Sequence, residues 1–78
     1  MSGLEALEKV EANLRTVMGN KREEYAWEKN TFKESEPDDP YREYHYQQMR
    51  RAFYEIQMLK TVLIWIDDTK EECEEEEL

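Results

Sequence analysis

Three glutamates in the first half of this sequence are the residues whose spacing could support metal chemistry. Glu24 and Glu28 are one helical turn apart, and Glu23 stands beside the first of them. Carboxylates of this kind can hold Mg²⁺ for hydrolysis, but the site needs a second set of acids on a facing segment. The only acids available there before residue 67 are Glu43 and Glu55, which lack a matching spacing. We therefore interpret the three glutamates as solvated acids on a helix face.

The single histidine, His45, could be a general base or a metal ligand. No Asp or Glu lies four residues before or after it, and Glu43 points to another face of a helix. Because a metal site needs several convergent ligands, we place His45 on an apolar stripe instead.

One cysteine, Cys73, excludes an intramolecular disulfide, and we assign it no redox role. The sequence also contains no phosphate-binding loop and no nucleophile–base pair. We therefore expect no catalytic residue, metal or cofactor, and a carboxylate–metal hydrolase remains a minor hypothesis.

The most strongly patterned stretch is residues 49–66, MRRAFYEIQMLKTVLIWI. Its apolar positions recur at alternating steps of four and three, which is the spacing of one helix face. Within it, Val62–Ile66 is apolar on every side, so one neighbouring helix cannot cover it. A strand over residues 61–66 is the alternative, but no partner strand exists in the sequence. The helical stripe consists of His45, Met49, Ala52, Ile56, Leu59, Leu63 and Ile66.

A first helix is predicted over residues 3–33. Ser2 and Glu5 form a capping box at its start. The Gly19-Asn20 pair could end this helix, since glycine in a helix interior costs about 1 kcal/mol relative to alanine. We favour one continuous helix, kinked at this pair if at all, because the stripe continues beyond it in register. That stripe is Leu4, Leu7, Val10, Leu14, Val17 and Met18, followed by Lys21, Tyr25, Glu28 and Phe32.

The clear break in helical pattern is residues 34–39, where Pro37 and several acids leave nothing apolar to bury. Asp39 can cap a second helix that has Pro40 in its first position, predicted over residues 40–68. Two helices joined by a short loop fold back on one another. We therefore predict an all-α fold, an antiparallel two-helix hairpin over residues 1–69. The surplus apolar surface predicts that it self-associates into an oligomer resembling a four-helix bundle.

The formal net charge of −9 is concentrated at one end of the chain. Residues 67–78 hold eight acids and one base, Lys70, so residues 1–66 carry only −2. Residues 70–78 have no apolar periodicity, and we predict a disordered acidic tail. The scarcity of clustered bases argues against direct nucleic-acid binding. The start of the sequence is unlike a signal peptide and no apolar run is long enough to span a membrane, so we expect a cytoplasmic protein without membrane contact.

Two sets of apolar and aromatic residues are candidates for binding. The first follows the strong stripe and is predicted to mediate self-association: Met49, Ile56, Leu59, Val62, Leu63, Trp65 and Ile66. The second flanks the loop, where a hairpin would bring its members to one end: Trp27, Phe32, Tyr41, Tyr44 and Tyr46. Tyr and Trp combine large apolar surfaces with a polar tip, which suits protein interfaces. These rings either close the end of the bundle or bind a partner protein.

Together these features predict a non-enzymatic helical interaction module that works as an oligomer, most simply a homodimer, and modulates an unidentified partner protein. The alternative is an acidic inhibitor, of the type that phages make, that blocks a nucleic-acid-binding or host-defence enzyme by polyanion mimicry. These two hypotheses differ in how much they depend on the acidic tail and on salt.

Overall fold

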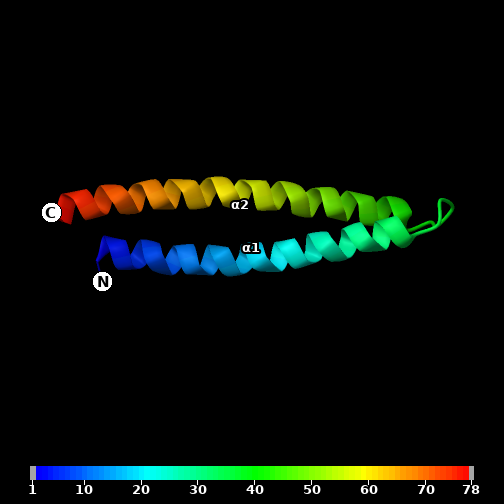
Figure 1. The fold of residues 1–78 in the computed structure, drawn as a ribbon, viewed down its shortest axis with the longest axis horizontal. Coiled ribbons are helices and arrows are strands. Elements are labelled where there is room, and N and C mark those ends of the chain that lie inside the picture. The colour runs from blue at the N-terminus through cyan, green and yellow to red at the C-terminus, as the bar shows by residue number, and fades with distance from the viewer. Residues whose placement is uncertain (1, 78) are drawn as a thin grey trace.

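The chain forms two long helices that run antiparallel and lie side by side along their whole length (Figure 1). The computed structural model describes residues 2–77, with α1 over Gly3–Glu34 and α2 over Arg42–Glu77. The molecule is rod-shaped, with extents of 62 × 16 × 12 Å. The predicted all-helical hairpin is therefore confirmed. No helix within residues 2–77 is long and apolar enough to cross a membrane.

α1 begins at its predicted capping residue, whereas the predicted cap of α2 lies in the turn that precedes that helix. The Ser2 hydroxyl accepts a hydrogen bond from the Glu5 backbone N–H at 3.1 Å. At the second start, Asp39 Oδ1 accepts one from the Tyr41 backbone N–H at 2.8 Å. The first bond satisfies an amide that has no partner inside α1, and the second stabilises the turn before α2. Regular α2 begins at Arg42, two residues later than predicted, because Pro40 and Tyr41 form a turn before it.

The two helices meet along one stripe each, which we call their inner faces. The inner face of α2 is the predicted stripe, and all of its members are buried or half-buried. Its core cluster joins Ile56 and Leu63 to Met18 of α1, with Leu14, Tyr25 and Leu59 packed around them. The inner face of α1 is Leu4, Leu7, Glu11, Leu14, Met18, Lys21, Tyr25, Glu28 and Phe32. Val10 and Val17 of the predicted stripe lie outside it and are exposed.

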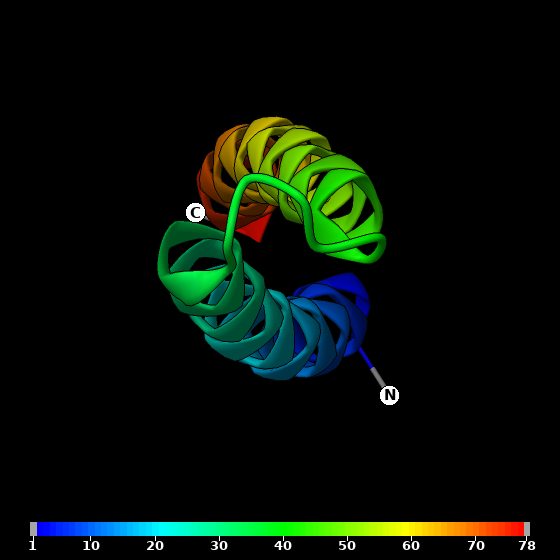
Figure 2. The same cartoon turned by 90° about the vertical axis from the view of Figure 1, so that its right-hand side faces the viewer.

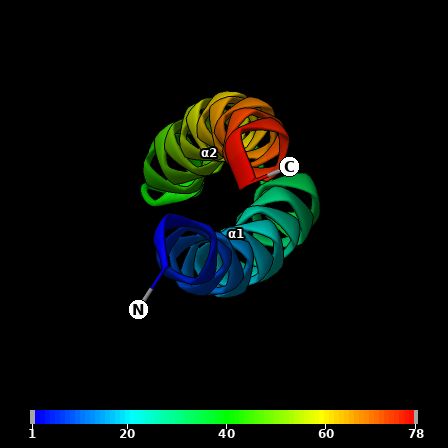
Figure 3. The ribbon, with the colours of Figure 1, turned by 90° about the vertical axis from the view of Figure 1, so that its left-hand side faces the viewer.

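The inner faces repeat every three and four residues, which averages less than the 3.6 residues of a straight helical turn. Helices with such a repeat stay in contact only by winding around each other. End-on views show this winding, with each helix turning about the other from the loop to the termini (Figures 2 and 3). The hairpin is therefore a short antiparallel coiled coil.

The Gly19-Asn20 pair does not interrupt α1, so the expectation of a continuous helix is confirmed. Glycine is not required there: no residue in the described chain has a positive φ, and a Cβ at Gly19 would meet nothing within 4 Å. Close packing against α2 therefore does not explain this glycine.

Gly19→Ala is expected to stabilise the hairpin by about 1 kcal/mol, because alanine has the higher helix propensity and no contact is disturbed. Urea unfolding followed by circular dichroism measures the change. Gly3→Ala is the matched control, because Gly3 also has open space around it. Gly3 lies in the first turn and not in the helix interior, so this substitution should change the free energy of unfolding less. A destabilised Gly19→Ala variant would contradict the continuous, unstrained helix.

The acidic C-terminal stretch differs from the expectation of a disordered tail. α2 continues to Glu77, so the structure places residues 70–77 in a helix. The inner face also continues beyond Ile66: Lys70 Nζ lies 3.0 Å from Glu11 Oε2 of α1, and Cys73 is half-buried. The prediction of disorder was based on the acidic composition of this stretch and did not take into account that α1 lies alongside it. Repulsion among the acids still opposes this last part of α2, whose final turn contains no base.

Candidate functional site

The loop end of the hairpin is held by Arg42, the first residue of α2. Its Nη1 donates hydrogen bonds to the carbonyl oxygens of Phe32 at 3.1 Å and Ser35 at 2.9 Å. Its guanidinium lies over the Phe32 ring, 4.2 Å from the centroid. Carbonyls at a helix C-terminus lack partners inside the helix, and a cation there also complements the helix dipole. Arg42 thus ties the end of α1 to the start of α2, a role that the sequence analysis did not predict.

A buried polar pair lies one to two turns from the loop. Glu28 is only 7% exposed, and its Oε2 lies 2.7 Å from Nδ1 of His45. Two aromatic rings flank the imidazole at steep angles, with ring centroids 5.7 Å away for Trp27 and 5.4 Å away for Tyr44. The interpretation of Glu28 as a solvated acid was therefore wrong. The stripe itself carried the correct signal, because it places Glu28 and His45 on the inner faces of the two helices.

The other two glutamates of the possible metal site do not join Glu28. Glu24 Oε2 lies 3.3 Å from Nζ of Lys21, and Glu23 is exposed. No three His, Cys, Asp or Glu side chains in residues 2–77 come together in an arrangement that could hold a metal ion. The acids that share a helix in the sequence thus diverge around it in space.

Two further ion pairs connect the helices. Lys21 Nζ lies 2.7 Å from Glu55 Oε2, and Lys70 pairs with Glu11 near the termini. With Glu28 and His45, every charged residue on the inner face of α1 therefore has a partner on α2. Three polar contacts spread along a rod fix the register of the two helices, because any slip would leave them unpaired.

These ion pairs predict a loss of stability in acid. The hydrogen bond from Lys21 lowers the pKa of Glu55 below its ordinary value of 4.5, and the hydrogen bond from Lys70 does the same to the pKa of Glu11. A carboxyl with a lowered pKa contributes stability above pH 4.5 and loses it as pH falls through the folded value. Urea unfolding between about pH 6 and pH 2 tests this.

Glu55→Gln provides the comparison for this pH series. It is expected to be less stable than the wild type at neutral pH and to converge with it in acid, where Glu55 is protonated. Acid also relieves repulsion among the exposed acids of α2. That effect is common to both proteins, so it cancels in the difference between their free energies of unfolding. A constant difference at all pH values would contradict the role assigned to this ion pair.

The predicted partner-binding aromatics do not form one surface. Trp27 and Tyr44 are exposed and both contact His45, whereas Phe32 and Tyr46 are half-buried and pack on each other at 5.2 Å. Tyr41 is exposed and belongs to neither pair. The loop end therefore offers two separate aromatic clusters, because the residues lie on different sides of the coiled coil.

The predicted self-association residues divide between the interior and the surface. Ile56, Leu63 and Ile66 are buried against α1 within the hairpin. Met49, Leu59 and Val62 are half-buried. Trp65 alone in the set is well exposed, at 62%. The exposed apolar surface instead includes neighbours that were not predicted, namely Val10, Val17, Phe53, Tyr54, Met58 and Ile64.

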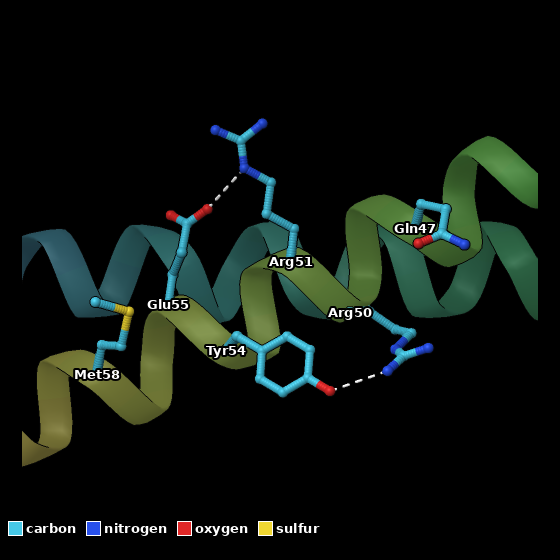
Figure 4. Close-up of a pocket in the computed structure, with 6 residues that line it drawn as sticks. All are labelled: Gln47, Arg50, Arg51, Tyr54, Glu55 and Met58. Carbon is cyan, nitrogen blue, oxygen red and sulfur yellow. Dashed lines mark hydrogen bonds and ion pairs between the residues drawn. The ribbon is translucent and has the colours of Figure 1, made fainter.

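One part of this surface is a shallow groove along α2 (Figure 4). Arg50 Nη2 donates a hydrogen bond to the Tyr54 hydroxyl at 2.9 Å, and Arg51 Nε donates to Glu55 Oε1 at 3.0 Å. Gln47 and Met58 complete its lining. The groove places two cations beside an aromatic ring and an exposed methionine.

Comparisons with protein families, with characterised proteins and with solved structures found no match for this chain.

Proposed function

We propose that this chain is a non-enzymatic interaction module that works as a homodimer and binds a partner protein. The observation that supports this most directly is the apolar surface that remains after the hairpin has closed. Met58, Ile64 and Trp65 are 69%, 59% and 62% exposed. Large apolar side chains gathered on one stretch of a small protein are typical of an interface. A two-helix hairpin buries one stripe per helix, so a second layer is the ordinary way to cover the rest.

The loop end is the part proposed to contact the partner protein. Trp27 and Tyr44 both rest against His45, and the buried bond to Glu28 fixes that ring. Aromatic side chains held in this way lose little entropy on binding, and they are common among the residues that dominate binding energy. Self-association through the middle of the rod would leave this end free.

Sedimentation equilibrium of the purified chain tests the homodimer. The expected mass is about twice 9.6 kDa at micromolar concentration, with dissociation on dilution. Trp65→Ser should weaken association while circular dichroism keeps its helical signal, because Trp65 is exposed in the hairpin. A fully helical monomer at all accessible concentrations would overturn the proposal of a homodimer.

For the partner, an affinity capture compares the wild type with Trp27→Ser. A specific partner should bind the wild type and a Tyr41→Ser control, which alters an exposed ring outside the Trp27 cluster, and should bind Trp27→Ser less. Equal capture by all three proteins would remove the loop end from the proposal.

A second candidate, inhibition by polyanion mimicry, is supported by the helical form of the acidic stretch. The acids of residues 67–76 are all exposed on α2, where a helix spaces them regularly. A basic surface that binds nucleic acid could accept such a row of carboxylates. Deletion of residues 70–78 should then abolish binding, and about 1 M salt should weaken it strongly because the Debye length falls to about 3 Å. Binding that survives both changes would exclude this candidate.

A further inference from the structure

The side of α2 that faces away from α1 has its own regular pattern, which we call the outer face of α2. Its members follow at steps of three and four residues, and all of them are exposed. Positions spaced in this way share one side of a helix. These positions fall between those of the inner face, so they lie on the opposite side. The outer face consists of Arg50, Tyr54, Met58, Thr61, Trp65, Asp68 and Glu72.

The charges on the outer face are ordered along the helix. Its N-terminal end is basic, with Arg50 and the adjacent Arg51. The middle is aromatic and apolar, with Tyr54, Met58 and Trp65 exposed over more than half of their surface. The C-terminal end is acidic, with Asp68 and Glu72 followed by Glu75 and Glu76. Read along the chain, the face is basic, then apolar, then acidic.

We propose that the outer face of α2 binds the same face of a second copy of this chain, antiparallel, about a two-fold axis near Thr61. This rests on the proposed function and specifies its homodimer contact. A two-fold interface must be self-complementary, because each patch meets its own copy in reverse. Arg50 and Glu72 lie equally far from Thr61 on either side, as do Tyr54 and Asp68. The basic end of each copy therefore meets the acidic end of the other.

The same order of charges disfavours a parallel pair. In that arrangement the arginines would lie beside arginines and the acids beside acids, and like charges in close contact oppose association. In the antiparallel pair, Met58 and Trp65 of both copies are covered at the centre, and the charges form the rim. The assembly is a four-helix layer in which the two α2 helices are central and the two α1 helices lie outside.

A competing surface lies in the groove between the helices. Val17 of α1 and Met58 and Leu59 of α2 line it, and a dimer through it would be a compact four-helix bundle. The ion pair of Lys21 and Glu55 also lines this groove, with both charges already satisfied within one chain. It therefore lacks free charges that could orient a second copy, whereas Arg50, Asp68 and Glu72 on the outer face of α2 are exposed and form no ion pair within the described residues.

Charge reversal at the two ends of the face tests the inference. One variant combines Arg50→Glu with Arg51→Glu, and the other combines Asp68→Arg with Glu72→Arg. Each is expected to self-associate at least about tenfold more weakly than the wild type, because both symmetry-related contacts become repulsive. Mixed in equal amounts, the two variants should recover dimers, since every contact then joins opposite charges. Sedimentation measures all three samples.

The matched control for the first variant combines Lys9→Glu with Arg22→Glu, which makes on α1 the same change in net charge as Arg50→Glu with Arg51→Glu. It should dimerise like the wild type if the contact is local, and circular dichroism confirms that each variant remains helical. Dimers of normal affinity in both charge-reversed variants would overturn the inference but leave the proposed homodimer intact. Loss of the dimer in Val17→Glu would then assign the contact to the groove between the helices.

Disulfide trapping keeps the inference testable if a charge-reversed variant fails to fold. In a Cys73→Ser background, Thr61→Cys should form a disulfide-linked dimer on oxidation because it lies at the two-fold axis. Gln47→Cys and Glu75→Cys should cross-link when mixed but not when oxidised separately. Cross-linking of Gln47→Cys with itself would establish a parallel pair and overturn the inference. A wild-type chain that is monomeric throughout would overturn both the inference and the proposed homodimer.

Discussion

Leu63→Asp is expected to unfold the hairpin. Leu63 is 6% exposed and packs with Met18 and Ile56 in the core cluster, which is the only such cluster among the described residues. Removing a buried leucine side chain costs about 2–5 kcal/mol, and a buried, unpaired carboxylate adds a further penalty. Because small domains have few kcal/mol of stability in total, this loss is sufficient for unfolding. Circular dichroism should show loss of the helical signal, and urea unfolding should show no folded baseline.

Ile64→Asp is the matched control for this experiment. Ile64 is the next residue of the same apolar run, but it is 59% exposed. The same new charge at that position therefore meets solvent, and the helical signal should persist. If Leu63→Asp remained as helical as Ile64→Asp, the inner face of α2 would be incorrectly assigned.

Glu28→Ala is expected to destabilise the hairpin by about 1–3 kcal/mol. The substitution removes the hydrogen-bond partner of His45 Nδ1, which lies 2.7 Å away in a largely buried position. A buried polar group that loses its partner is unfavourable because it does not regain the water that bound it in the unfolded chain. Thermal unfolding at neutral pH measures the loss. Glu23→Ala, an exposed acid on the same helix, should change stability little.

A double substitution separates the value of the pair from the penalty of breaking it. Glu28→Leu combined with His45→Leu replaces both partners by apolar side chains, and such replacements are often neutral or stabilising. We therefore expect the double variant to be at least as stable as the wild type. The lost polar contact would show instead as reduced specificity of register, visible as extra signals in an NMR spectrum. A double variant as unstable as Glu28→Ala would mean that the imidazole packing against Trp27 and Tyr44, and not its bond to Glu28, stabilises this region.

Local spacing along the chain is sufficient to predict the helical hairpin, the cap of α1 and the inner face of α2. These features depend on contacts between residues a few positions apart, so local spacing is enough to predict them. They include the helix periodicity, the hydrogen bonds of Ser2 and Asp39, and the break at the prolines of the loop. The same local rule placed Lys21 and Glu28 on the face of α1 that meets α2, although their charges suggested solvent. The continuous path of α1 through Gly19 also followed from this spacing.

The contacts between the two helices, by contrast, follow from how the helices pack and could not be predicted from local spacing. Three hydrogen bonds join residues that are not neighbours in the sequence. They link Glu28 to His45, Lys70 to Glu11, and Arg42 to the carbonyl oxygen of Phe32 at the end of α1. The length of α2 depends on this as well, because its acidic end lies alongside α1 and is tied to it by Lys70. Residues 62–66 form one apolar run in the sequence, but once α2 packs on α1 its helix periodicity turns Leu63 and Ile66 towards α1 and leaves Ile64 and Trp65 exposed. The register of two helices is a relation between distant positions, and no local pattern contains it.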